Sequence, residues 1–494
     1  MNKAVVGAVA LVVVAAGGGV GFAAWSGGKV AGELQAQTSA LLAPFPGIKV
    51  VENSVTKGLF SSVHTVTLDV GCAPVSEAAL QPAVDTGPAA KPIQITWRDH
   101  VSHGPVPGGK GLGLATIDTE FVLPPELAAQ LARLYGDQPI VKVHTALGFG
   151  GTYVSDLTSP PFKYAEAGKG DIDWRGVKAT VRGSLSGGVA AGGSYTFEAP
   201  GLSVNFASEQ ANGTLRVGRM SLEGEIAPQA GASLLLAPGR GTGGIDNITF
   251  ALAPAGGKVV DVSFENLVLS SEAKVDAQGL WSAVSKLGMK GRVDDFAIEQ
   301  VDMQVSLNRL HGPTYQQLIS RAMQSSFGCH KPGDEAAMRE AAAMAADLQK
   351  GFATLLMHNP EYGLDRLAVR LGGKTAELSY RLGMKGVTEA DAALPLPALV
   401  GTKGYGNATF KVDNGWLEQV VKKVVATKAA AEGVPADETV AQTMMMINAT
   451  LDDLVAKGYV AREGEAVVSK ASFEGGMLKV NDQPLNVPMG MIAK

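Results

Sequence analysis

The chain has 494 residues, of which 46% are hydrophobic, 18% are charged and 62 are glycine. This length can bury a large core, and the glycine-rich, apolar composition is typical of many turns between strands of small residues. A net charge of −5 and the lack of any long Lys/Arg run argue against nucleic-acid binding, because such proteins need an excess of positive charge.

The N-terminus carries the clearest signal. Lys3 is followed by an uncharged run from Ala4 to Ala24 and then by Trp25. The run is long enough to cross a bilayer as a helix, and Trp suits the membrane interface. We therefore expect a signal anchor at residues 1–27, with the rest of the chain on the trans side. A cleaved signal peptide is the alternative, because residues 21–23 form a small-x-small site.

The first half of the chain reads as short strands separated by turns. In the first of them Phe60, His64, Val66, Leu68 and Val70 fall on one side at period two, which predicts one apolar and one wet face. We expect an antiparallel β-meander sheet interrupted by one helix at residues 124–137. The expected strand segments are 48–71, 91–104, 115–123, 138–157, 171–188, 194–226, 244–254, 258–276 and 292–310.

Beyond residue 310 the apolar period changes to that of helices. Helices are expected at 312–327, 334–357, 416–433 and 437–458, and strands at 362–386, 407–412 and 466–487. The fold class is therefore α+β, with a β-rich domain at 28–275 and an α+β domain at 276–494. Whether one sheet continues across that boundary is left open. In the Met-rich stretch 443–447, Met444 belongs to the apolar stripe, and Met445 and Met446 are expected to fill the core; an adaptable binding surface is the alternative.

No catalytic motif is present. The stretch Gly239–Gly244 fits G-x-G-x-x-G, but a strand follows it, whereas a nucleotide site needs a helix there. We predict no catalytic residue, no cofactor and no metal. The alternative is an envelope hydrolase or metal-dependent enzyme centred on His103, with His64, His100 and Asp99 nearby. His64 by itself is expected to be a hydrogen-bonded core residue, because it lies on the apolar side of its strand.

The two cysteines, Cys72 and Cys329, are too few for a disulfide framework or a four-cysteine zinc site. Whether they form one long-range disulfide depends on the distance between them in the fold, and is left open.

Four segments together resemble the YdgA-like family of bacterial envelope proteins. They are "VTKGLFSSVHTVTLDV" (55–70), "VSHGPVP" (101–107), "LLMHNPEYGLDRLAV" (355–369) and "ASFEGGMLKVNDQPL" (471–485), although Asp482 stands where that family has glycine. The resemblance implies a Gram-negative inner-membrane protein with a periplasmic body, and it implies no catalytic residues. The matching motif residues are interpreted as structural: Gly58, Phe60, Ser61, Ser62, His103, Gly104, Pro105 and Asn481.

These observations favour a non-enzymatic binding or structural protein of the cell envelope. Its sheet, apolar on one face, either packs its helices or presents a groove to a lipid, a lipoprotein or an envelope-assembly partner. The lipid version requires an apolar surface that the helices leave uncovered. The membrane is the expected partner of the N-terminal helix, and homo-oligomerisation is left open.

Overall fold

The computed structural model describes residues 38–39, 42, 45, 47–72, 92–109, 111–186, 189–227, 236–326, 335–432 and 436–485. The expected anchor at 1–27 lies outside these residues, as does Cys329, so the anchor stays a prediction and the pairing of Cys72 with Cys329 stays open. Among the helices in the described ranges, none combines the length and the apolar character that crossing a membrane requires.

The described chain is dominated by antiparallel strands, as expected, and it divides into two compact units that interleave in sequence. The first unit comprises Met1–Ser203, Arg219–Gly239 and Gly312–Phe352. The second comprises Val204–Gly218, Arg240–His311 and Ala353–Lys494. The predicted boundary near residue 275 stays a prediction.

The first unit is built on a sheet with the order β1-β2-β3-β4-β5-β6-β9-β10-β13, every neighbouring pair antiparallel. The strands β7 and β8 pair with each other as a hairpin. The bounds are β1 Lys49–Lys57, β2 Ser61–Cys72, β3 Pro92–His103, β4 Ala115–Val122, β5 Lys142–Leu147, β6 Thr152–Ser159, β7 Phe162–Glu166, β8 Gly170–Trp174, β9 Val177–Ser186, β10 Val189–Ala199 and β13 Met220–Ile226.

Helix α3 (Pro125–Tyr135) confirms the helix expected at 124–137, and it connects β4 to β5. Proline at its first position costs no hydrogen bond there, and Gly136, at a φ of 61°, ends it. The other helices of the unit are the 3-10 turn η2 (Pro107–Gly109), α4 (Gly312–Ser326) and the part of α5 (Glu335–Met357) that ends at Phe352.

The sheet of the first unit buries its apolar face. Val66, Val101, Ile117 and Leu147 are all almost fully buried, and they come from four different strands. They alternate with exposed or half-buried residues, which is the period-two pattern that the sequence shows. The core of this unit therefore lies on one side of the sheet.

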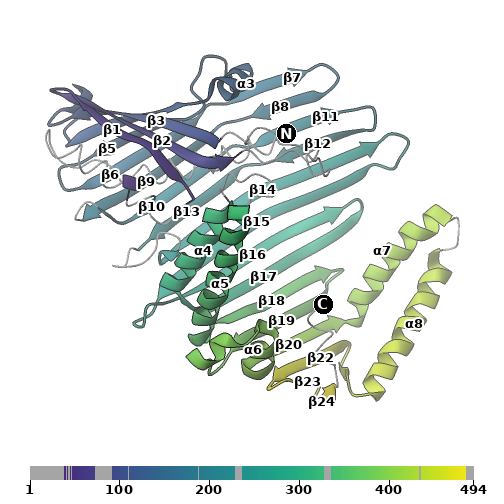
Figure 1. Ribbon diagram of the computed structural model, residues 1–494. Coiled ribbons are helices and arrows are strands. Elements are labelled where there is room, and N and C mark those ends of the chain that lie inside the picture. The colour runs from purple at the N-terminus through teal and green to yellow at the C-terminus, as the bar shows by residue number, and fades with distance from the viewer. Residues whose placement is uncertain are drawn as a thin grey trace. The chain divides into compact units, whose positions relative to one another are not determined.

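The second unit carries a sheet with the order β15-β16-β17-β18-β19-β20-β22-β23-β24, and β21 pairs with β22 as well (Figure 1). Strand β12 pairs with β14. The bounds are β12 Ala211–Val217, β14 Gly239–Pro254, β15 Val260–Val275, β16 Leu280–Val293, β17 Phe296–His311, β18 Glu361–Leu371, β19 Lys374–Met384, β20 Gly404–Asp413, β21 Ala461–Glu463, β22 Ala466–Glu474, β23 Met477–Val480 and β24 Gln483–Leu485; β11 is Leu202–Ala207.

Helices of the second unit lie at the ends of its strands. The C-terminal turn of α5, the 3-10 turn η4 (Glu389–Ala393) and α6 (Leu396–Lys403) surround a small core at Met384. Helices α7 (Asn414–Glu432) and α8 (Ala436–Ala456) form the yellow-green hairpin in Figure 1. The sequence predicted α5, α7 and α8 but not η4 or α6; α6 is a helix of eight residues that begins after Pro395.

Candidate functional site

Most of the family-motif residues meet at one end of the first unit's sheet, where β1 turns into β2 and β3 ends. Gly58 donates its backbone N–H to the Ser61 carbonyl at 2.7 Å, which closes the β1–β2 turn with Phe60 exposed at its tip. His103 donates its N–H to the Phe60 carbonyl at 2.9 Å, and its Nε2 lies 2.9 Å from Ser62 Oγ. The motif therefore ties two neighbouring loops together.

The glycine of the His-Gly-Pro motif is required by a close backbone approach. A Cβ on Gly104 would lie 2.0 Å from the carbonyl oxygen of Gly113, far inside any real contact. Gly104 donates its N–H to the Leu114 carbonyl at 2.7 Å, and Gly113 donates to the Pro105 carbonyl at 3.1 Å. These contacts hold the backbone at Gly104 and Pro105 against residues 113–114, which agrees with a structural role for both motif residues.

The histidines of the hydrolase alternative do not converge in one pocket. His64 is 1% exposed; its Nδ1 lies 3.1 Å from Asp99 Oδ2 and its Nε2 lies 2.9 Å from Asn53 Oδ1. It is thus the hydrogen-bonded core histidine that the strand pattern predicts. His103 lies on the same face, four residues along β3 from Asp99. His100 lies on the other face, exposed beside Glu120.

Metal ligation finds no support in this part of the fold. No group of three or more His, Cys, Asp or Glu side chains within the described residues is placed to hold a metal ion. Thr119 Oγ1 donates to the second oxygen of Asp99 at 2.6 Å, so both carboxylate oxygens are already hydrogen-bonded. The hydrolase alternative stays a prediction.

The last motif residue, Asn481, forms a tight hairpin turn in the second unit. It lies between β23 and β24 with a φ of 45°, and Asp482 follows at 67°. A two-residue hairpin loop with both φ values positive is a type I′ turn, in which Asn and Asp are tolerated better than other residues. Asn481 also accepts the Lys470 N–H through Oδ1 at 2.8 Å. Asp482 therefore keeps the turn that glycine would make.

The sheet of the second unit has one apolar face. Residues that pair directly across antiparallel strands share a face, so the register defines rows of side chains. One such row crosses six strands from β15 to β20: Leu269, Leu287, Met303, Leu367, Leu378 and Phe410. A second row on the same face runs from β16 to β22: Ala283, Leu307, Tyr362, Leu382, Gly406 and Phe473. We call this surface the apolar face.

Within the described residues of the second unit, helices cover the apolar face only near its ends. At one end Ala376, Val412 and Val467 are buried against Trp416 and Leu417 of α7 and against Leu451 of α8. At the other end Met384 packs against Leu356 and Leu399. Between these clusters Leu269, Tyr362, Leu382 and Phe410 are 42% to 53% exposed. A large apolar surface is therefore open to solvent.

The few polar groups on the apolar face bond to each other. Ser271 and Ser285 pair across β15 and β16, with their hydroxyl oxygens 3.0 Å apart. The rings of Tyr362 and Tyr380 lie 6.0 Å apart, and the hydrogen bond from Tyr362 is the main cause that raises the pKa of Tyr380. The face thus offers few unused hydrogen-bonding groups to a partner.

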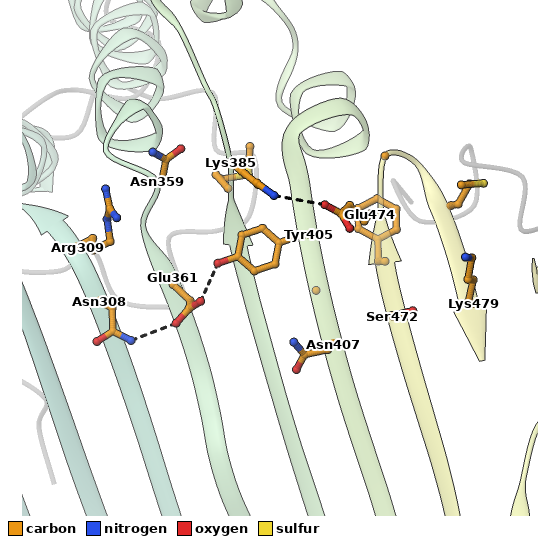
Figure 2. A pocket seen from close by; sticks show the side chains of 15 residues that line it. Asn308, Arg309, Asn359, Glu361, Lys385, Tyr405, Asn407, Ser472, Glu474 and Lys479 are labelled. Carbon is orange, nitrogen blue, oxygen red and sulfur yellow. Dashed lines mark hydrogen bonds and ion pairs between the residues drawn. The ribbon is translucent and has the colours of Figure 1, made fainter. Parts of the chain in front are cut away.

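The opposite face of the same strands is polar and carries a cleft of about 900 Å³ (Figure 2). Tyr405 donates its hydroxyl to Glu361 at 2.7 Å, and Asn308 donates to the other oxygen at 3.4 Å. Burial, and secondarily the bond to Glu361, raises the pKa of Tyr405. Other lining residues include Arg309, Lys385, Asn407, Ser472, Glu474 and Lys479.

The cleft depends on a glycine beneath an aromatic ring. A Cβ on Gly383 would lie 2.6 Å from the Tyr405 ring, so the ring rests directly on the β19 backbone. Sequence reasoning missed these residues because they come from six strands and meet only through the register. Polar and apolar surfaces therefore occupy opposite faces of one sheet.

The Met-rich stretch of α8 differs from its expectation. Met444 and Ile447 are half-buried, but Met445 and Met446 are 72% and 65% exposed. The prediction that these two methionines fill the core is wrong, because the helix pairs with α7 along one side only and they lie on the other.

Comparison with known proteins matches the chain to a family model whose description names no activity. No curated protein and no solved structure matches the chain. Residues 1–488, nearly the whole chain, match the family model DUF945, described as bacterial protein of unknown function. The chain therefore belongs to the DUF945 family of bacterial proteins.

Proposed function

We propose that this protein is a non-enzymatic binding protein of the bacterial cell envelope that holds lipid acyl chains on the apolar face of its second unit. The observation that carries the proposal is the uncovered stretch of that face, where Leu269, Tyr362, Leu382 and Phe410 are exposed. Soluble proteins rarely leave a contiguous apolar surface of this extent without a partner.

The chemistry of the face favours a hydrocarbon chain over a peptide. A bound peptide would bring backbone N–H and C=O groups that need partners, whereas the serines and tyrosines of the face are already engaged with each other. A row that crosses six strands spans about 24 Å at the usual strand spacing. That exceeds the roughly 15 Å depth of the chains in one bilayer leaflet. An acylated lipid or the acyl group of a lipoprotein would fit.

The proposal includes a location. The uncharged run from Ala4 to Ala24 would anchor the chain in the inner membrane, with the body in the periplasm, as the YdgA-like resemblance implies. A protein anchored beside a bilayer has its lipid ligand close at hand.

The test compares two adjacent residues of β20 that point to opposite faces. Phe410 lies on the apolar face, whereas Thr409 lies on the polar face and pairs with Lys470. The full chain would be purified in detergent and titrated with a fluorescent long-chain fatty acid. We expect Phe410→Glu to weaken binding by about tenfold or more, because it places a charge against the chain. Thr409→Glu, the matched control, should leave binding unchanged.

Two results would contradict the proposal. The first is the absence of fatty-acid binding by the unaltered chain together with no co-purifying lipid in native mass spectrometry. The second is a dimer in solution that Phe410→Glu dissociates, since the face would then be covered by a second copy.

A further inference from the structure

Three loops of the first unit expose large apolar side chains at the same end of its sheet. The register of β1 to β6 brings together the turn at 58–60, the connection at 104–114 and the turn at 148–151. We call these residues the loop end. Its exposed side chains are Leu59 (84%), Phe60 (77%), Val106 (49%), Leu112 (79%) and Phe149 (59%). All of them except Val106 are more exposed than the open residues of the apolar face in the second unit.

The loops are fixed to each other by backbone hydrogen bonds. His103 N–H bonds to the Phe60 carbonyl at 2.9 Å and joins the first loop to the second. Leu114 N–H bonds to the Leu147 carbonyl at 2.8 Å and joins the second to the third. Ser62 and His103 add a side-chain contact. The apolar tips are thus held side by side before any partner binds, which lowers the ordering cost of docking.

Charge distinguishes the loop end from the opposite end of the same strands. The sequence of the three loops and their flanking residues contains Lys57 and Lys110 and no Asp or Glu. At the opposite end the β4–β5 connection, residues 123–141, carries Glu126 and Asp137 with one positive charge, Arg133. None of the described residues of that connection is an exposed large hydrophobic side chain. The apolar and basic character therefore belongs to one end of the sheet.

We propose that the loop end docks on the surface of an anionic lipid bilayer. Isolated Leu, Phe and Val side chains on glycine-rich turns can enter the headgroup boundary, about 5–10 Å deep, without inserting charged groups. Lys57, at the end of β1 beside the turn at 58–60, gains from the negative surface potential of anionic lipids. A protein partner would need a complementary surface with polar groups for the exposed loop backbone. The inference concerns the first unit alone and does not rest on acyl-chain binding by the second.

The experiment places a photo-crosslinking amino acid, benzoylphenylalanine, at position 149 of the full chain. The matched control carries the same group at position 138, where Gln138 is exposed at the opposite end of the sheet. Each protein is mixed with vesicles of phosphatidylcholine and phosphatidylglycerol in equal parts and irradiated. Mass spectrometry then identifies the adducts. We expect lipid adducts at position 149 and at most a trace at position 138.

A second set of variants tests the apolar tips. Leu112→Asp, in the protein labelled at position 149, should lower the lipid-adduct yield by about tenfold, since burial of one leucine is worth roughly that factor. Lys57→Gln should lower it only when the vesicles contain phosphatidylglycerol. Circular dichroism would confirm that both variants stay folded. The proposal is overturned if the adducts at position 149 are protein, including a second copy, if no adduct forms, or if both positions yield lipid equally.

Discussion

The two units share the same alternating strand pattern but differ in whether the apolar face of the sheet is covered. In both, apolar side chains alternate along antiparallel strands and line up across the sheet. In the first unit that face is closed, and Val101 is 1% exposed at its centre. In the second unit the middle of the face is open, and Phe410 is exposed. Alternation therefore defines which side of a sheet is apolar, whereas the covering elements decide whether that side is a core or a binding surface.

The largest expected difference between the units is the cost of a charge on the apolar face. Val101→Asp would bury an unpaired carboxylate and should cost at least about 4 kcal/mol of unfolding free energy. Phe410→Asp should cost about 1 kcal/mol, because the new carboxylate stays hydrated. Urea unfolding followed by circular dichroism measures both. Similar losses would mean that the second face is covered in solution.

A second comparison tests the glycine of the His-Gly-Pro motif within the loop end. Gly104→Ala should cost about 3 kcal/mol, because the new Cβ would overlap the Gly113 carbonyl. Gly150→Ala, which meets nothing within 4 Å, should be neutral or slightly stabilising. Thermal unfolding of the two variants measures the difference. Equal stability would remove the structural reason given for Gly104.

A third comparison contrasts a buried with an exposed histidine pair in the first unit. Asp99→Ala removes the partner of His64 and of Thr119, and should cost about 2–3 kcal/mol. Asp118→Ala removes only an exposed partner of His144 and should cost less than about 1 kcal/mol. Chemical denaturation of both variants measures these losses. If Asp99→Ala lowers the unfolding free energy by less than about 1 kcal/mol, water must reach His64 in place of the lost carboxylate.

The smallest effect is expected in the cleft of the second unit. Tyr405→Phe removes the hydroxyl that Glu361 accepts and should cost about 1 kcal/mol at neutral pH. Because the pKa of Tyr405 is raised above its usual 10.0, the folded chain keeps this proton when the unfolded chain has lost it. The contribution is full below about pH 10 and falls as pH rises through the folded pKa. Melting temperatures across that range should decline less in Tyr405→Phe.

Local sequence patterns predicted the elements well. Helix α3 lies within the expected segment because its proline start and glycine stop act locally. Strand β14 ends at Pro254 as expected, but it begins at Gly239 and not at Gly244, so the apparent nucleotide motif lies inside the strand and not before it. The core position of His64 follows from alternation along β2 alone. Each of these features depends on neighbours within a few residues.

Contacts that depend on register were beyond the sequence. The partner of His64 is Asp99, 35 residues away, and Glu361 meets Tyr405, 44 residues away. Nothing near either residue specifies the alignment of their strands. The grouping of His100 with His103 failed for a simpler reason, since residues three apart on a strand point to opposite faces. The exposure of Met445 likewise follows from tertiary packing, because α8 packs against other elements along one side only.

The exposed methionines of α8 have a chemical consequence. A thioether in water is open to oxidants, and conversion to the sulfoxide turns a soft apolar side chain into a polar one. Met445 and Met446 would react first and without disturbing the hydrophobic core, whereas buried Met384 is shielded by its neighbours. Oxidation of Met445 and Met446 should therefore leave the core intact, whereas oxidation of Met384 would place a polar sulfoxide in the core beside α6.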